Sequence, residues 1–319
     1  MKKEFKLQSS DGKNELAGYH YLVNGSFLKG ALVILHGMNE YAGRYEGFIE
    51  YLNDNGYAVV IFDQLGHGHS AKSKDDLGYF GEKDSPEFLV KDARLMVDQT
   101  KLWYKDVPII LMGHSMGSNI GRRFCEKYPN AISGFIQMGS MGKGDAFTNL
   151  FGGLLLKTMA LIRGGKTHSK FASNMAFKPF LKRIKDPVTP CDWLSKDLQI
   201  CKEYLKDDFC NFPFTLRGLL DIMDDRTYVN RDEWFEKLNP DIPLLIISGE
   251  EDACGNYGLD QKVMYERLKS KMNDLSLKLY PNDRHEILNE TDKEVVFSDI
   301  LEWLNHLCLK NIYLSDGKR

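Results

Sequence analysis

Short apolar runs recur along the chain and alternate with segments of helical periodicity. Continuous apolar runs are typical of strands that are covered on both faces of a sheet. They predict six strands, at residues 31–35, 58–62, 109–112, 134–138, 244–248 and 275–280. Residues 16–22 alternate apolar and polar side chains instead, which predicts an antiparallel strand at the edge of the sheet.

Four further segments have apolar residues at the spacing of an amphipathic helix. Gly56 and Pro129 end the first and the third of these segments, which are residues 45–55, 86–104, 118–128 and 292–309. Because strands and helices alternate, we predict an α/β fold with a mostly parallel, doubly wound sheet and helices on both of its faces.

The alternation stops at residues 141–228, which contain no clear buried strand and are interrupted by several glycines and prolines. A long insertion after the carboxyl end of a strand usually lies over the active site of an open α/β sheet. We therefore expect a core formed by residues 1–140 and 229–319, with a helical lid insertion at residues 141–228.

The composition of the 319 residues is that of a soluble globular protein, with 43% hydrophobic and 27% charged residues. A formal net charge of -3 provides no overall attraction to nucleic acid, so we expect no such partner. The chain begins with polar residues rather than an apolar signal segment, and its longest apolar stretch, 150–162, is too short to span a bilayer. Six scattered cysteines without a C-x-x-C pair argue against a zinc site and a disulfide framework, and they favour a cytoplasmic location.

The first half of the insertion is strongly basic. Residues 143–186 contain nine basic and two acidic side chains, a net charge of +7 that leaves -10 for the rest of the chain. The apolar stretch 150–162 lies in the same segment, and this combination suggests peripheral contact with an anionic lipid surface. A solvated, lysine-rich rim around a packed subdomain explains the same composition, so both interpretations stay open.

Residues 113–117 form the pentapeptide Gly-His-Ser-Met-Gly, with Ser115 at its centre. A predicted strand precedes this pentapeptide and a predicted helix follows it. A serine at such a turn is held above the sheet in a strained conformation, and the glycines on both sides allow neighbouring elements to approach. This context identifies Ser115 as the candidate nucleophile, with a structural Gly-Ser turn as the alternative.

A nucleophilic serine needs a base that takes its proton and an acid that orients the base. After a strand–serine–helix turn of this kind, the acid precedes the histidine along the chain. Asp252 follows the strand 244–248 and His285 follows the strand 275–280, so both are expected in loops at the carboxyl edge of the sheet. Glu250 and Glu251 compete with Asp252 for the role of the acid.

The negative charge that develops on the substrate oxygen needs hydrogen-bond donors. We expect the backbone N–H of Met116, which follows the nucleophile, and that of Met38, in the loop after the strand 31–35. The N-terminus of the helix after Ser115 adds a favourable dipole. This chemistry requires neither a cofactor nor a metal.

Other polar residues have an ordinary structural explanation beside a functional one. The two histidines of the glycine-rich turn 63–70 accompany a single clear carboxylate, so we interpret the turn as a structural loop rather than a metal site. His36 and His114 are expected to brace loops. Cys254 is either a reactive thiol beside the acid or a small apolar filler.

Five motifs resemble those of monoacylglycerol lipases and lysophospholipases, which are serine hydrolases of the α/β-hydrolase superfamily. Residues 36–45 resemble their H-G-x-x-E-H-x-x-R-Y signature, 63–70 their D-x-x-G-H-G-x-S turn and 113–117 their nucleophile elbow. Residues 248–258 and 284–290 resemble their acid and histidine loops. The resemblance implies an α/β-hydrolase fold and cofactor-free hydrolysis of carboxylic esters of monoacylglycerols or lysophospholipids.

Two departures weaken the transfer of substrate detail. Tyr41 stands where the signature has histidine, and Ala253 and Cys254 stand where the acid loop commonly has proline and valine. Three alternatives therefore stay open: a carboxylesterase for small soluble esters, an aminopeptidase of the same fold, and a non-catalytic binding or receptor protein on a hydrolase scaffold.

Overall fold

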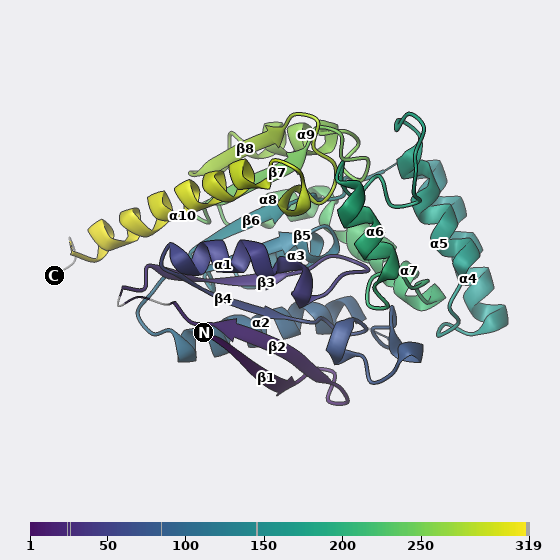
Figure 1. The fold of residues 1–319 in the computed structure, drawn as a ribbon, viewed down its shortest axis with the longest axis horizontal. Helices are drawn as coiled ribbons and strands as arrows, with labels where there is room; N and C mark the ends of the chain where they lie inside the picture. The colour runs from purple at the N-terminus through teal and green to yellow at the C-terminus, as the bar shows by residue number, and fades with distance from the viewer. Residues whose placement is uncertain (24, 26, 84, 145, 317–319) are drawn as a thin grey trace.

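Eight strands form one sheet in the computed structural model, which describes residues 1–23, 25, 27–83, 85–144 and 146–316 (Figure 1). Asp145 of the basic segment and residues 317–319 of the second core segment lie outside this description, as do the side chains of residues 146–149 and 309–316. Across the sheet the strands follow the order β1-β2-β4-β3-β5-β6-β7-β8. Along the chain they are β1 (Lys2–Gln8), β2 (Glu15–Tyr21), β3 (Gly30–Leu35), β4 (Tyr57–Phe62), β5 (Ile109–His114), β6 (Gly134–Met138), β7 (Leu244–Gly249) and β8 (Leu275–Tyr280).

The parallel part of the sheet consists of the six strands predicted from apolar runs. Each of β3 to β8 pairs in parallel with its neighbours within this set. Every residue of β3, β4, β5, β6 and β7 is buried. This burial explains their nearly continuous apolar sequences, because layers of helices cover both faces.

The antiparallel strand β2 is not the edge of the sheet, so that part of the prediction is wrong. β2 pairs with β4 on one side and with β1 on the other, and both pairings are antiparallel. β1 has the sequence KKEFKLQ, and most of its residues are exposed. Charged side chains are typical of edge strands, and here they hide the alternation that would have predicted β1.

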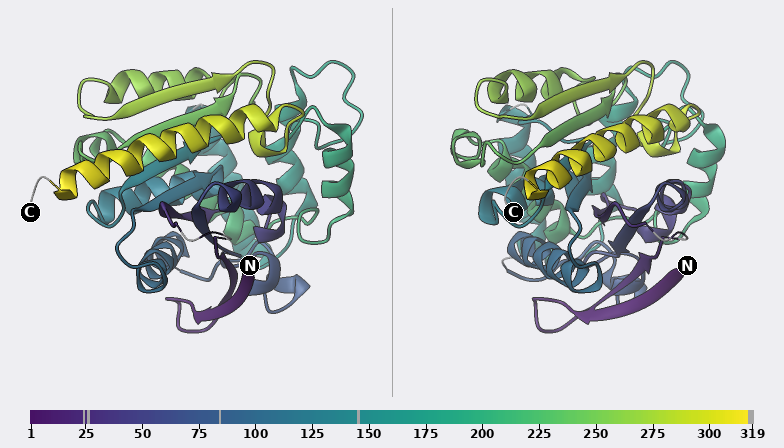
Figure 2. Two further views of the ribbon diagram at one scale, coloured as in Figure 1. Left: turned by 60° about the vertical axis from the view of Figure 1, so that its left-hand side comes forward. Right: turned by 90° about the vertical axis from the view of Figure 1, so that its left-hand side faces the viewer.

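Helices pack on both faces of the sheet, as predicted from the alternation of strands and helices. α1 (Glu46–Asp54) and α10 (Lys293–Asp316) cover one face. The other face carries α2 (Ser85–Trp103), α3 (Met116–Lys127), α8 (Asp232–Lys237) and α9 (Leu259–Leu268), of which α8 and α9 were not predicted. The two views in Figure 2 show α10 running along the sheet and projecting beyond it towards the C-terminus.

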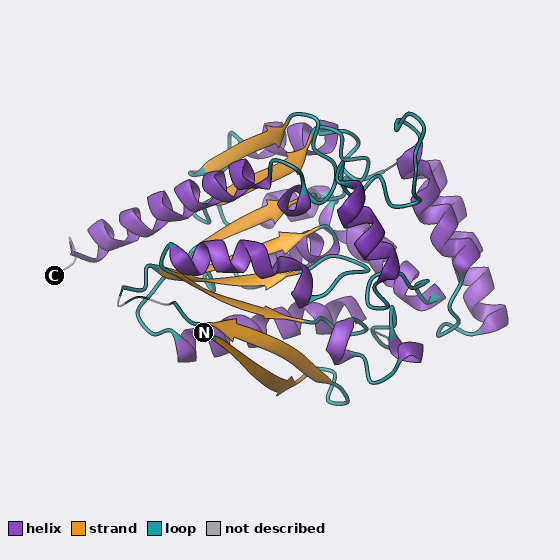
Figure 3. Cartoon of the chain, in the orientation of Figure 1, coloured by secondary structure: helices purple, strands orange, loops and turns teal. Residues whose placement is uncertain are grey.

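Four helices of the segment between β6 and β7 lie beyond the carboxyl ends of the parallel strands (Figure 3). They are α4 (Ala146–Arg163), α5 (Lys170–Phe177), α6 (Leu198–Lys206) and α7 (Leu216–Val229). Short 3-10 helices in the described chain are Ala42–Tyr45, Gly68–Ser70, Lys74–Asp76, Lys178–Leu181 and Ile287–Asn289. None of the helices described is both long and apolar enough to cross a bilayer.

Candidate active site

Ser115 occupies the turn between β5 and α3 in a strained backbone conformation. Its φ of 51° and ψ of -115° lie in a region of backbone conformation that residues other than glycine rarely adopt. The Ser115 N–H donates to the Met138 carbonyl at 2.9 Å, which ties the turn to the end of β6. A Cβ on Gly117 would lie 2.1 Å from the Leu35 carbonyl oxygen, so only glycine allows α3 to approach β3 this closely.

Asp252 and His285 form a buried hydrogen-bonded pair. The His285 Nδ1 lies 2.9 Å from Asp252 Oδ1, and the two residues are 3% and 0% exposed. Asp252 also accepts hydrogen bonds from the Ser248 hydroxyl at 3.1 Å and the Cys254 N–H at 2.9 Å. Burial alone would raise the pKa of Asp252, but His285 and these hydrogen bonds outweigh it and lower the pKa. The acid is therefore ionised at neutral pH.

The two competing acids of the same loop are exposed to solvent. Glu250 and Glu251 are exposed, whereas Asp252 is buried beside the histidine. Burial raises the pKa of the Cys254 thiol well above its usual value, and the adjacent Asp252 carboxylate raises it further. A thiol that stays protonated is a weak nucleophile, so Cys254 behaves as the apolar filler.

The end of β6 brings the serine and the histidine to one place. Gly139 directly follows Met138, whose carbonyl accepts from Ser115, and a Cβ on Gly139 would lie 3.3 Å from both His114 Cδ2 and His285 Cε1. The loops after β5, β7 and β8 therefore carry Ser115, Asp252 and His285 to the same carboxyl edge of the sheet.

The loop after β3 passes directly beside Ser115. A Cβ on Gly37 would lie 3.1 Å from the Ser115 Cβ and only 2.5 Å from Glu40 Oε1, so the loop favours glycine at this point. Met38 follows Gly37 and is partly exposed, while Met116 is buried and opens α3. These positions are compatible with the predicted donation from both backbone N–H groups, which stays a prediction.

A second buried pair, Glu40 and His114, supports this loop; His114 braces it as expected, whereas the sequence did not indicate the role of Glu40. Glu40 accepts a short hydrogen bond from the Gly37 N–H and a bond of 3.0 Å from the Tyr45 hydroxyl, and its Oε1 lies 2.6 Å from His114 Nδ1. Burial would raise the pKa of Glu40, but the neighbouring His114 lowers it to about 2. The His114 Nε2 lies 3.3 Å from the His285 carbonyl oxygen, so His114 links the loop after β3 to the loop that carries His285.

His36 and the turn 63–70 brace this edge of the sheet, as expected of structural histidines. His36 Nε2 accepts from the Gln64 N–H at 2.9 Å. Asp63 accepts from the Ala42 and His69 N–H groups at 2.8 and 2.7 Å. Burial lowers the pKa of His67 to about 3, because its ring lies in an aromatic cluster.

Residues 191–196, which we call the strap, run along the loop of residues 283–292, which we call the histidine loop. The N–H groups of His285 and Glu286 donate to the carbonyls of Trp193 and Leu194 at 3.4 and 2.7 Å. The Trp193 ring also packs on the His285 ring, with centroids 5.2 Å apart and planes inclined by 40°. Sequence analysis missed the strap because its contacts join irregular segments about ninety residues apart.

Side chains add further bonds between the strap and the histidine loop. Glu290 accepts from the Ser195 hydroxyl and from the N–H groups of Lys196 and Arg284, at 3.1, 3.1 and 2.9 Å. The Lys196 ammonium donates to Asp283 Oδ1 at 2.6 Å. The strap is thus attached to the histidine loop at both its backbone and its side chains.

Two groups of possible metal ligands occur in the part of the chain that is described. Asp252, Cys254 and His285 form one, and Asp283, Glu290 and Asp292 form the other. In the first group His285 is bonded to Asp252, and in the second the Lys196 ammonium already lies among the carboxylates. Neither arrangement needs a metal ion for charge compensation.

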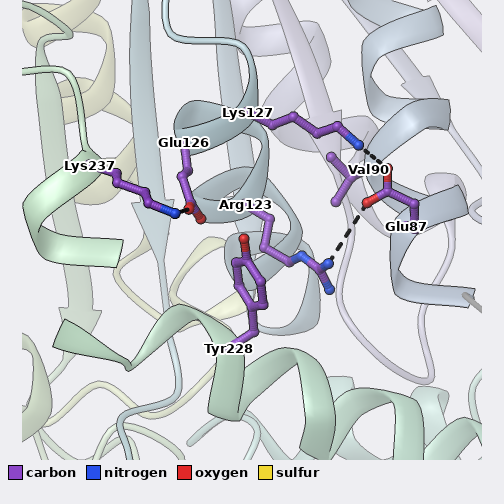
Figure 4. A pocket seen from close by; sticks show the side chains of 7 residues that line it. All are labelled: Glu87, Val90, Arg123, Glu126, Lys127, Tyr228 and Lys237. Atoms are coloured by element: carbon purple, nitrogen blue, oxygen red, sulfur yellow. Dashed lines mark hydrogen bonds and ion pairs between the residues drawn. The ribbon is translucent and has the colours of Figure 1, made fainter. Parts of the chain in front are cut away.

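A cavity of about 340 Å³ lies at the other end of α3, between α2, α7 and α8 (Figure 4). Its walls are formed by Glu87, Val90, Arg123, Glu126, Lys127, Tyr228 and Lys237. Ion pairs join Lys127 and Arg123 to Glu87 and Lys237 to Glu126 (Figure 4). The cavity shares no lining residue with the site around Ser115.

Known proteins resemble this chain in sequence and fold. Residues 27–292 match the protein family described as Serine aminopeptidase, S33. The chain is 26% identical to a monoacylglycerol lipase of Mycolicibacterium smegmatis over 88% of this chain and 89% of that protein. It is 27% identical to a monoglyceride lipase of Saccharomyces cerevisiae over 87% and 85% of the two chains. Its fold matches a thermostable carboxyl esterase from Bacillus coagulans, solved in complex with glycerol, with a TM-score of 0.89 and 27% identity over 96% and 99% of the two chains.

Proposed function

Because the chain belongs to the serine aminopeptidase family and has the α/β-hydrolase fold, we propose that it cleaves carboxylic esters of monoacylglycerols or lysophospholipids. One observation carries the proposal. The buried Asp252–His285 pair reaches the end of β6, where a Cβ on Gly139 would contact His285, and the Ser115 N–H bonds to the Met138 carbonyl at the same point from a turn with a φ of 51°. The names of the two lipase relatives and of the esterase support an ester rather than an amide as the substrate.

In the proposed reaction Ser115 attacks the ester carbonyl while His285 takes its proton. Asp252 accepts the hydrogen bond from Nδ1, which leaves Nε2 free to act as the base. The ionised Asp252 also stabilises the imidazolium that forms in this step. His285 then returns the proton to the leaving alcohol, and the acyl group stays on Ser115 until water releases it by the reverse sequence.

The oxyanion of both tetrahedral intermediates is proposed to bind the N–H groups of Met38 and Met116. The close approach of Gly37 to Ser115 supports this assignment, as does the start of α3 at Met116. Loss of one such donor typically lowers turnover by a factor on the order of 10²–10³. Because these donors belong to the backbone, substitution of either methionine by alanine is a weak test.

Hydrolysis of a matched substrate panel by the protein and by Ser115→Ala tests the proposal. The panel contains a long-chain monoacylglycerol, lysophosphatidylcholine, short and long nitrophenyl esters and an aminoacyl anilide. We expect cleavage of the long-chain lipids that depends on Ser115. Cleavage of only the short esters, or of the anilide, overturns the substrate class, and full activity of Ser115→Ala overturns the mechanism.

We further propose that residues 141–228 act as a lid over a core formed by residues 1–140 and 229–319, and that α4 contacts lipid surfaces. The stripe of Leu150, Leu154 and Leu161 on α4 is 68%, 60% and 87% exposed. The spacing of these leucines places them on one face of the helix, and Lys157 lies on the same face. Apolar side chains with an interspersed cation suit the boundary between anionic head groups and acyl chains.

The location that fits this proposal is the cytoplasm, with peripheral membrane contact. All six cysteines are free and buried, which supports a reducing compartment. Flotation with anionic and neutral vesicles tests the lipid contact, and we expect binding that is stronger to anionic vesicles and weakens with salt. Equal recovery with and without vesicles favours the solvated rim instead.

A further inference from the structure

An indole ring covers the proposed catalytic base. The Trp193 ring centroid lies 5.2 Å from that of His285, and Trp193 is 9% exposed. The indole also packs against Phe177 and Phe180, at centroid distances of 5.8 and 4.9 Å. Trp193 is therefore held in an aromatic cluster that includes the His285 ring.

The backbone fixes this contact as firmly as the side chains. The Trp193 carbonyl accepts from the His285 N–H at 3.4 Å, and the neighbouring Leu194 carbonyl accepts from the Glu286 N–H at 2.7 Å. Arg284 adds a bond from its guanidinium to the Ser195 carbonyl at 3.1 Å. The strap and the histidine loop thus hold the two rings together without relying on ring packing.

The charge on His285 changes during the proposed reaction, whereas its neighbours keep theirs. Asp252 bonds its Nδ1, the His114 ring lies 4.7 Å away and is paired with Glu40, and Cys254 is a protonated thiol. The ring becomes a cation when it takes the proton of the nucleophile. A cation within about 6 Å of an aromatic centroid is attracted by the ring quadrupole, most strongly by that of tryptophan.

We propose that Trp193 is a positioning residue that stabilises the positively charged form of His285 during turnover. The proposal rests on the proposed function, because it assumes that His285 is the general base. The effect is greater in the transition state than in the resting enzyme, since the imidazolium is present only in the former. Trp193 consequently contributes to kcat more than to substrate binding.

The chain contains a matched control pair away from the site. The Trp103 ring stacks on the His20 ring with centroids 4.5 Å apart and planes inclined by 27°. His20 lies on β2 and Trp103 ends α2, so neither belongs to the loops that carry the triad. Trp103→Leu removes an indole from a histidine without affecting the proposed base.

The first test compares Trp193→Phe, Trp193→Leu and Trp103→Leu with the unaltered protein. We expect Trp193→Leu to lower kcat/KM about fivefold, chiefly through kcat, and Trp193→Phe to lower it by about half that factor. Loss of the stabilised cation moves the acidic limb of the pH profile of kcat/KM to lower pH, by about 0.7 unit for a fivefold effect. Trp103→Leu is expected to change neither quantity.

Two outcomes of this test overturn the proposal. Unchanged kinetics in Trp193→Leu show that the indole has no role in turnover. A fall in kcat with the acidic limb unmoved assigns Trp193 a purely structural role. If the unaltered protein has no hydrolysis that depends on Ser115, the proposed function fails instead, and the fluorescence test below separates the two failures.

The second test needs no turnover, because it follows Trp193 emission in the Ser115→Ala variant. The difference between this variant and its Trp193→Phe derivative isolates the Trp193 signal, since Trp103 beside His20 contributes equally to both. We expect acidification to quench the Trp193 emission. This quenching should disappear when His285→Gln is added. If Trp193 emission does not change with the protonation of His285, the proposed contact with the cation is overturned.

Discussion

The strap and helix α4 belong to the same stretch of chain between β6 and β7, yet the strap is mostly buried and hydrogen-bonded whereas α4 exposes apolar side chains. The strap is mostly buried, and its polar groups bond the histidine loop through Glu290, Arg284 and Lys196. α4 exposes leucines along one face, beyond the ends of the strands. One segment is fixed by directional bonds, and the other presents apolar area that needs no fixed geometry.

This difference corresponds to two separate tasks in the proposed function. Directional hydrogen bonds position groups within a fraction of an ångström, which general base catalysis requires. Apolar area contributes free energy in proportion to the surface removed from water and tolerates many arrangements, which suits a fluid lipid surface. In the proposed function, the strap therefore serves the chemistry at His285 and α4 serves the contact with lipid.

Removal of the Glu290 carboxylate should have the largest effect, because it takes away bonds between the strap and the histidine loop. Glu290→Ala removes the acceptor of the Lys196 and Arg284 N–H groups and one of the two acceptors of the Ser195 hydroxyl, at a cost of about 3 kcal/mol in the free energy of unfolding. We expect kcat to fall as well, because the histidine loop loses part of its attachment to the strap. Urea denaturation and ester hydrolysis measure the two effects. Glu290→Gln keeps an acceptor oxygen, so its free energy of unfolding should lie between those of Glu290→Ala and the unaltered protein. If Glu290→Ala is as stable as the unaltered protein, the proposed role of the strap is contradicted.

Substitutions on α4 should affect vesicle binding and leave ester hydrolysis nearly unchanged. The combined substitution of Leu150, Leu154 and Leu161 by serine is expected to weaken binding to anionic vesicles by about tenfold or more, since each leucine loses apolar burial in the lipid. Hydrolysis of a soluble short-chain ester should stay within about twofold, because no triad contact changes. Leu102→Ser is the matched control, as Leu102 is 65% exposed on α2. A loss of binding in the control as large as in the triple variant would falsify the assignment of α4.

Acidification should stabilise the strap region by a smaller amount. Burial and the nearby Glu290 raise the pKa of Asp283 to about 6 in spite of the Lys196 ammonium. A carboxyl with a raised pKa in the folded state binds protons more readily there than in the unfolded chain, so stability increases as the pH falls from about 7 towards the unfolded value. We expect this increase in the unaltered protein and a weaker one in Asp283→Asn, measured by urea denaturation at pH 7.5 and 5. Identical pH dependence in the two proteins would exclude Asp283 as the source.

The smallest effect is expected from a single change at the exposed end of α4. Leu161→Gln should alter the free energy of unfolding by no more than about 0.5 kcal/mol, because Leu161 is 87% exposed. Its neighbour Leu156 is 4% exposed and packs in the main core, so Leu156→Ala serves as the contrasting control and should cost about 2–5 kcal/mol. Thermal or urea unfolding of both variants gives the comparison; a large loss in Leu161→Gln means that α4 packs against protein on that side.

The sequence predicted those parts of the molecule whose physics is local. Ser115 and Asp252 follow buried apolar strands and His285 follows the partly buried β8, so their convergence follows from the parallel sheet. β1 was missed because its exposed, charged side chains follow no apolar pattern. The contact between Trp193 and His285 was missed for another reason: it joins two irregular loops, and neither propensity nor periodicity describes such pairs.

The attachment of the strap also bears on how this scaffold can be recombined. A designer who replaces the whole of residues 141–228 with the insertion of a relative removes the partners of Glu290 and Arg284 together with α4. An exchange limited to α4 and α5, residues 146–177, leaves those bonds in place. The natural cut points for chimeras therefore lie inside the insertion rather than at its borders.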